Sequence, residues 1–249
     1  MAIGNSHLNA LRMAVKAETA EEQFGFHIDY LSTFDPQYQP FWSRDGGECI
    51  PHAQFETDAA ALMNDVKADL VVAFVSGVFQ FTYGTYEDAR PFDFFLPQAP
   101  DLGVLHGREI IPYDLILETA RGANQLWPPL LRRIIAWAGP APVISIGPPP
   151  PIADFTPFYA EVKEKADERG FQPDSARAKL WRVQVFTERE HAAALGAQFL
   201  DSPREAVMEP GLLRAEYAAD PVHANVRFGR LLAHEIQGVL TRRRETEEK

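Results

Sequence analysis

The sequence predicts an α/β protein, a single three-layer α/β/α domain over residues 1–249 around a central parallel sheet of about five strands. Short apolar runs alternate with longer amphipathic ones, which is the pattern of repeated strand and helix units. The run at 69–76 is apolar on both faces, as a central parallel strand is. The length suits one large domain with a substantial core, and we find no internal repeat or low-complexity linker.

The elements follow from apolar periodicity and from breaker residues. Strands are expected at 1–4, 24–31, 69–76, 142–146 and 198–200. Helices are expected at 8–16, 53–68, 158–169, 177–195 and 225–240, with one or two more inside 112–138. Gly122 and the pair Pro128-Pro129 are expected to interrupt the helical stretch within 112–138.

The charge balance argues against a nucleic-acid partner. The chain has a formal net charge of -11 and a pI near 5.1, whereas affinity for nucleic acid depends on clustered Lys and Arg. The triplet Arg242-Arg243-Arg244 is followed by Glu245 and Glu247, so it is interpreted as a solvated helix end.

No metal or other cofactor is expected. Cys49 is the single cysteine, which excludes an intrachain disulfide and a cysteine metal cluster. The histidines lack the spacing of zinc ligands, and neither glycine-rich nucleotide motif occurs. No apolar run reaches the about 18 to 20 residues of a membrane span. No export signal is recognised, so a cytoplasmic location is expected if Met1 is the native start.

Two short stretches at opposite ends of the chain provide the groups of acyl-transfer chemistry. Gly4-Asn5-Ser6-His7 offers a nucleophile, and Asp220-Pro221-Val222-His223 offers an acid three residues before a base. Ser6 follows the first strand and Asp220 precedes the last helix, so both stretches are expected at the carboxyl edge of the sheet, where α/β proteins bind ligands. The alternative for Ser6 is an N-cap of the first helix, and for Asp220 a cap or turn residue.

These two stretches resemble the first and last conserved blocks of the SGNH hydrolases, also called the GDSL esterase and lipase family. The stretch 216–225, which contains Asp220 and His223, is similar to the final block, and 69–77 and 142–151 are similar to the strands between. The resemblance implies the flavodoxin-like fold of this family. It also implies that Ser6 is the nucleophile, His223 the general base and Asp220 the orienting acid.

The blocks that would stabilise the oxyanion depart from the family pattern. Asn5 replaces the usual aspartate of the first block, and Phe79 replaces the asparagine that donates to the oxyanion in the family. Loss of one such donor costs about a hundredfold to a thousandfold in turnover. Candidate donors are therefore the Ser6 N–H, the Asn5 amide, a glycine of the pair Gly46-Gly47 with Gly47 preferred, the Gly77 N–H and the Gln80 amide.

An aromatic-rich insertion is expected around 78–110. Phe79 and Phe81 within it, together with Trp42 and Arg44 upstream, are candidate substrate-binding residues, Arg44 as an anchor for an anionic group. Packing of these aromatic rings against the body of the domain is the alternative.

The predicted function is a serine esterase that cleaves a small acyl or O-acetyl ester of a small molecule or glycan through an acyl-Ser6 intermediate. Two alternatives stay open: an acyltransferase with the same triad, and a catalytically weak protein that binds a glycan or protein. The sequence does not decide the oligomeric state.

Overall fold

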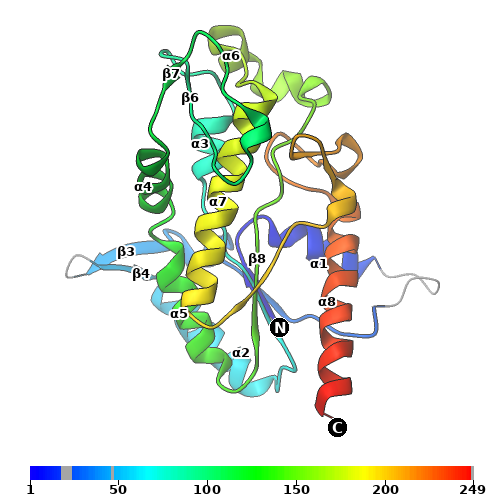
Figure 1. Ribbon diagram of the computed structural model, residues 1–249. Helices are drawn as coiled ribbons and strands as arrows, with labels where there is room; N and C mark the ends of the chain where they lie inside the picture. Colours follow the sequence, from blue (N-terminus) through cyan, green and yellow to red (C-terminus); the bar gives the residue numbers. More distant parts are fainter. Residues whose placement is uncertain (18–23, 46–47, 248–249) are drawn as a thin grey trace.

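A computed structural model describes residues 1–17, 24–45 and 48–247 of the chain. At its centre lies a parallel five-stranded sheet with strand order β2-β1-β5-β8-β9 (Figure 1). The strands are β1 (Ala2–Gly4), β2 (Tyr30–Ser32), β5 (Val71–Phe74), β8 (Val143–Ile146) and β9 (Gln198–Leu200). The predicted fold class, a parallel sheet flanked by helices, is confirmed.

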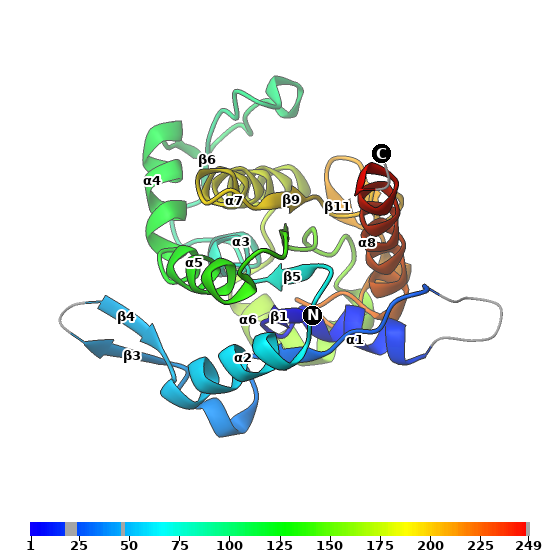
Figure 2. The same ribbon diagram turned by 90° about the horizontal axis from the view of Figure 1, so that it is seen from below.

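Helices cover both faces of the sheet. On one face lie α1 (Leu8–Lys16) and α8 (Val226–Glu247), and on the other lie α2 (Ala53–Asp65) and α5 (Trp127–Ala138) (Figure 2). Residues of β5 alternate between these layers: Val72 and Phe74 pack with the first, Val71 and Ala73 with the second. This alternation explains why the strand is apolar at every position.

The contact between α1 and α8 is close enough to require a glycine. A Cβ atom on Gly229 would lie 2.0 Å from the Ala10 carbonyl oxygen, so any larger residue would force the two helices apart. This contact matters for the site, because α1 and α8 follow the segments that carry Ser6 and His223.

The stretch 78–110 packs against the long helix α7 (Asp174–Ala194). It contains α3 (Phe79–Gly84) and the short strands β6 (Phe92–Asp93) and β7 (Glu109–Ile110), and is followed by α4 (Tyr113–Ala123). Lys179 of α7 is fully buried, pairs with Asp93 and donates to the Phe94 carbonyl at 3.0 Å. Phe79 and Phe94 are also fully buried, so for these two rings the packing alternative holds.

The remaining elements connect this framework. They are the antiparallel hairpin of β3 (Trp42–Asp45) and β4 (Glu48–Pro51), the helix α6 (Tyr159–Arg169), and the hairpin of β10 (Val207–Met208) and β11 (Leu212–Leu213). The β3–β4 hairpin, which the sequence did not predict, extends away from the body (Figure 2). No helix in the described ranges is both long and apolar enough to cross a membrane.

Several expected elements differ in extent or position. The second strand covers only Tyr30–Ser32, because its partner β1 is itself three residues long and pairs with those residues alone. The pair Pro128-Pro129 starts α5 instead of interrupting a helix, since proline fits the first turn, where its missing N–H is not needed. The last helix continues beyond residue 240 to Glu247.

Candidate active site

Ser6 lies in the tight turn between β1 and α1. The turn passes so close to β5 that a Cβ atom on Gly4 would lie 2.7 Å from the Phe74 carbonyl oxygen, which explains the glycine two residues before the serine. The Asn5 side chain fixes the turn, since its Oδ1 accepts from the His7 N–H at 3.1 Å and its Nδ2 donates to the Ser76 carbonyl at 3.0 Å. Ser6 itself is partly exposed.

Asp220 organises the turn that carries His223. One carboxylate oxygen accepts from the N–H groups of Val222 and His223, both at 2.8 Å. The other oxygen lies 2.7 Å from His223 Nδ1. The same residue therefore holds both the backbone of the turn and the ring that the turn presents.

Asn225 fixes the turn from its other side. Its Nδ2 donates to the carbonyls of Glu216 and Ala218 at 2.8 and 3.0 Å. Its Oδ1 accepts from the Arg227 N–H at 2.9 Å at the start of α8. The loop is thus tied to the helix N-terminus, which limits how far His223 can move.

The hydrogen-bonded chain is completed by Ser6. Its Oγ lies 2.8 Å from His223 Nε2, so three residues from the two ends of the sequence are joined by consecutive hydrogen bonds. With the Asp220 carboxylate accepting from Nδ1, the other ring nitrogen is free to accept the serine proton. The Asp220 carboxyl is partly buried, which tends to raise its pKa, but the hydrogen bonds from Val222 and His223 outweigh burial and leave that pKa below its ordinary value.

A second histidine, His7, packs against His223 but makes no hydrogen bond with the three residues. Burial, and after it the proximity of His223, lowers the pKa of His7 to about 3, so this imidazole is neutral at pH 7. Its ring lies 5.1 Å from the His223 ring and 5.6 Å from Phe81, on which it stacks. His7 therefore places an uncharged surface beside His223 and would not repel a positive charge on that ring.

A cavity of about 320 Å³ opens beside the triad. Ser6, Asp220 and His223 lie in its wall, together with both polar and apolar residues. The further lining residues are Asn5, Leu8, Asn9, Arg12, Tyr30, Ser32, Ala219 and Ala224. This volume is at the lower end of ligand sites, which suits a small substrate.

Arg12 is the cationic side chain in the described wall of this cavity, and sequence reasoning missed it. Its guanidinium lies 4.4 Å from the centre of the Tyr30 ring, and its buried Nε has no hydrogen-bond partner among the described atoms. Only weak signs of this role are present in the sequence. Arg12 lies one helical turn beyond Leu8 in α1, and Tyr30 lies in β2, where it pairs with Ala2 of β1.

The expected oxyanion donors at the end of β5 are used elsewhere. The Gly77 N–H donates to the buried Glu188 carboxylate at 2.9 Å, and the Gln80 side chain, which is 2 % exposed, donates to the Pro149 carbonyl at 3.0 Å. The expectation therefore does not hold for Gly77 or Gln80. The Ser6 N–H has no acceptor within the described part of the chain, so it stays a candidate donor. Asn5 lines the cavity and also stays a prediction, while Gly47 lies outside the described residues.

The proposed substrate contacts are also corrected in part. Phe79 is 1 % exposed and packs in the core against α7, which corrects that prediction. Phe81 is partly exposed and stacks on His7, so its contact with substrate stays a prediction. Trp42 contacts Phe41 and Trp127, with ring centres 4.9 and 5.9 Å apart, so it belongs to the packing on the far face of the sheet. The Arg44 side chain lies outside what the structure describes.

Comparison with solved structures finds similar folds at low sequence identity. The periplasmic domain of a Salmonella ser. Paratyphi A lipopolysaccharide acetyltransferase matches 96% of this chain and 82% of that chain, with 12% identity and a TM-score of 0.53. A GDSL-like lipase from Bacteroides thetaiotaomicron matches 97% of this chain and 86% of its own, with 14% identity and a TM-score of 0.45.

A third match is a carbohydrate acetylesterase from Sinorhizobium meliloti, covering 96% of this chain and 98% of that chain, with 13% identity and a TM-score of 0.40. No family model matches the sequence, and no curated protein matches it. The likeness to the acetyltransferase domain shows a shared fold, which agrees with the fold that the two end motifs imply.

Proposed function

We propose that this protein is an SGNH-type serine hydrolase that cleaves a small carboxylic ester through an acyl-Ser6 intermediate. The observation that carries the proposal is the hydrogen-bonded chain from Asp220 through His223 to Ser6, with contacts of 2.7 and 2.8 Å. Nucleophile, base and orienting acid thus lie in the order that acyl transfer requires, next to a cavity that a substrate can enter.

The reaction would proceed in two halves. Ser6 Oγ attacks the acyl carbon while His223 Nε2 takes the serine proton, and Asp220 stabilises the imidazolium that results. His223 then returns the proton to the leaving alcohol, which departs and leaves the acyl group on Ser6. In the second half water, deprotonated by His223, attacks the acyl-enzyme. His223 then gives the proton to Ser6 Oγ as the acyl–oxygen bond breaks, which releases the acid and free Ser6.

The cavity supports a small and polar substrate, such as an acetyl ester on a sugar or metabolite. At about 320 Å³ it has room for a short acyl group with part of its alcohol. Asn9, Ser32 and Arg12 provide polar groups in its wall. The Ser6 N–H, in the turn just before α1, is the donor we assign to the oxyanion.

Acyl transfer to an alcohol acceptor is the second candidate. The triad acts identically in both reactions, and the partly exposed Ser6 admits either water or another hydroxyl. Product analysis with a short-chain aryl ester in the presence of glycerol or glucose distinguishes the two, because a transferase yields the acylated acceptor and a hydrolase the free acid.

A fluorophosphonate probe tests the shared chemistry. We expect a single phosphonylated serine at Ser6, mapped by peptide mass spectrometry, with labelling absent in Ser6→Ala. Ser32→Ala is the matched control, because Ser32 lines the same cavity and undergoes the same chemical change. Absence of labelling in the wild type, together with no turnover of short-chain aryl esters, would reject the proposal and favour a binding protein.

A further inference from the structure

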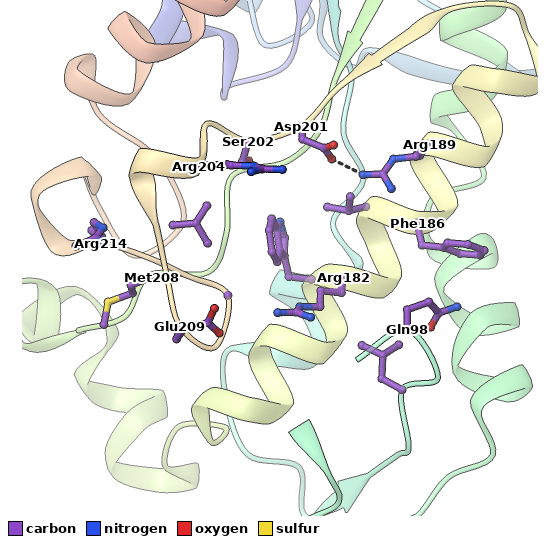
Figure 3. A pocket seen from close by; sticks show the side chains of 15 residues that line it. Gln98, Arg182, Phe186, Arg189, Asp201, Ser202, Arg204, Met208, Glu209 and Arg214 are labelled. Atoms are coloured by element: carbon purple, nitrogen blue, oxygen red, sulfur yellow. Dashed lines mark hydrogen bonds and ion pairs between the residues drawn. The ribbon is translucent and has the colours of Figure 1, made fainter. Parts of the chain in front are cut away.

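A second and larger cavity lies between α7 and the segment 201–214 that follows β9. Its volume is about 690 Å³, and its described lining includes none of the three triad residues. Figure 3 shows Arg182 and Arg189 reaching from α7 toward the segment that carries Arg204. Arg214, from the residues after β11, also lines the cavity.

This cavity concentrates positive charge in an acidic protein. Its described lining carries the four arginines just named against two acids, Asp201 and Glu209, while the whole chain has a net charge of -11. The described lining contains arginine but no lysine. Arginine presents a planar fork of donors that matches carboxylate and phosphate groups, which lysine does not.

Two of the four arginines are committed to the protein and two are not. Arg189 pairs with Asp201 and lies over the Phe199 ring at 5.4 Å, and Arg182 donates to the Pro210 carbonyl at 2.8 Å. Arg204 and Arg214 are exposed, and their side chains make no hydrogen bond or ion pair with the described residues. The cavity therefore holds two guanidinium groups that are available to an anion.

The segments that carry these two free arginines are held in place. The Arg214 N–H donates to the Ala206 carbonyl at 3.0 Å, and β10 pairs with β11 between them. Because the backbone is fixed at both positions, an anion that binds either side chain does not have to order the loop as well.

An apolar and aromatic surface lines the same space. Trp181 is partly buried, and its indole N–H donates to the Pro148 carbonyl at 3.1 Å, which fixes the ring. Ser202 donates to the same carbonyl at 3.0 Å from the other wall, and Val185 and Val207 add apolar surface. A flat apolar body is therefore complementary to this part of the cavity.

We propose that this cavity is a binding site for an organic anion, a carboxylate or phosphate group attached to a planar apolar body. Arg204, whose side chain points toward α7, binds the anionic group, and Arg214 adds positive charge at the other end of the lining. Trp181 with its apolar neighbours contacts the body. The site is separate from the ester chemistry proposed for Ser6, so each of the two proposals can fail without the other.

Fluorescence titration with 8-anilinonaphthalene-1-sulfonate, an aromatic anion, tests the site. We expect saturable binding to the wild type that weakens about tenfold or more in the double variant Arg204→Gln/Arg214→Gln, because hydrogen bonds to charged groups are lost. The double variant Arg90→Gln/Arg132→Gln is the control, since it removes two exposed arginines outside the described lining of the cavity and changes the net charge equally. Ser6→Ala should bind the dye like the wild type.

Two comparisons give the test its specificity. The neutral analogue N-phenyl-1-naphthylamine should bind the wild type and the Arg204/Arg214 variant alike, because it lacks the group that the arginines recognise. Competition by 1-naphthoate or by 1-naphthyl phosphate supports the site and shows which anionic group it prefers. Dye binding that both double variants retain, or that neither naphthyl anion displaces, would overturn the proposal.

Discussion

Ser6 and Ser76 follow neighbouring strands of one sheet at equivalent positions, each two residues beyond the paired residues Gly4 and Phe74. Both are near a carboxylate, yet their surroundings differ. Ser6 is partly exposed beside a cavity and reaches its acid through an imidazole. Ser76 is completely buried and donates directly to Glu188 at 3.0 Å.

The difference explains why we propose Ser6, and not Ser76, as the nucleophile. An imidazole between hydroxyl and carboxylate can take the proton and return it, whereas a carboxylate alone has little affinity for a serine proton. Ser76 also has no described opening to solvent, so no substrate can reach it. We therefore assign the chemistry to the end of β1 and a structural role to the end of β5.

The sharpest test of this comparison exchanges each serine for alanine. Ser6→Ala should reduce kcat/KM for 4-nitrophenyl acetate to background, a loss of about 10⁵-fold or more, because the nucleophile is gone. Ser76→Ala should leave turnover nearly unchanged and lower the free energy of unfolding by about 1–3 kcal/mol, since Glu188 loses a buried donor. Loss of turnover in a folded Ser76→Ala variant would contradict the assignment.

The second prediction concerns the acid of the triad. In Asp220→Asn the amide oxygen can still accept from the N–H groups of Val222 and His223, so the turn is kept. The amide nitrogen, however, faces His223 Nδ1 and favours the tautomer whose Nε2 carries the hydrogen, which cannot accept the proton of Ser6. We expect about a 10³- to 10⁴-fold lower kcat with an unchanged thermal midpoint.

Asp154→Asn is the control for this variant. Asp154 also accepts from an N–H two residues later, that of Thr156 at 2.8 Å, but it lies outside the described wall of the triad cavity. A similar loss of turnover in both variants would show that the effect is not specific to the triad.

The contrast between the two strand ends also explains what the sequence could reveal. Ser6, Asp220 and His223 stand in short motifs, and a parallel sheet brings the two motifs to one edge, so the triad geometry was predictable. The end of β5 was not, because Glu188 reaches Ser76 across 112 residues of sequence and no local pattern marks that contact. Phe79, Gly77 and Gln80 were misplaced for the same reason: each packs against α7 or the loop after β8.

The fold shows the same division. The existence of the five strands was predictable from apolar runs. The length of the second strand was not, because it is set by pairing with the three residues of β1. The β3–β4 hairpin was not predictable either, because its antiparallel pairing leaves no apolar periodicity in the sequence. Arg12 was overlooked because a single arginine on a predicted helix looks like a solvated residue until the cavity beside it is known.

The third prediction concerns the buried carboxyl of Glu188, which contacts Ser76 at the end of β5. Burial raises the pKa of Glu188 to about 7 from an ordinary value of 4.5, although hydrogen bonds from Gly77, Gln184 and Ser76 oppose the shift. Between these two pH values the folded protein retains a proton that the unfolded chain has released, so this group makes stability fall as pH rises through the window. Above about pH 7 Glu188 is ionised in both states, and its contribution to the free energy of unfolding no longer changes with pH.

Glu188→Gln should remove this dependence, because the amide resembles the protonated acid. The free energy of unfolding of the variant relative to the wild type should therefore increase by up to about 3 kcal/mol between pH 4.5 and 7.5. His7 contributes an opposite slope, since its pKa lies at about 3, but this contribution is common to both proteins and cancels in the difference. Glu190→Gln, two residues further on the exposed side of α7, is the control, and a flat difference for Glu188→Gln would contradict the prediction.

Asn5 links the end of β1 to the end of β5, and the smallest predicted effect concerns this link. Its Nδ2 donates to the Ser76 carbonyl from a side chain that is 5 % exposed. In Asn5→Asp a carboxylate oxygen would face that carbonyl oxygen, and we expect a loss of about 1–3 kcal/mol in the free energy of unfolding at pH 8. The loss should shrink toward pH 4, because the protonated acid can donate to the Ser76 carbonyl again.

Asn9→Asp provides the matched control, because Asn9 lines the same cavity on the exposed side of α1. Chemical denaturation at several pH values measures the stability, and kcat/KM for 4-nitrophenyl acetate measures the site. If Asn5→Asp loses turnover at pH 8 while its stability matches that of Asn9→Asp, Asn5 acts on the reacting ester and the oxyanion prediction for its amide is strengthened. If stability falls and turnover of the folded protein is retained, Asn5 serves as the link between β1 and β5, and the Ser6 N–H carries the oxyanion without it.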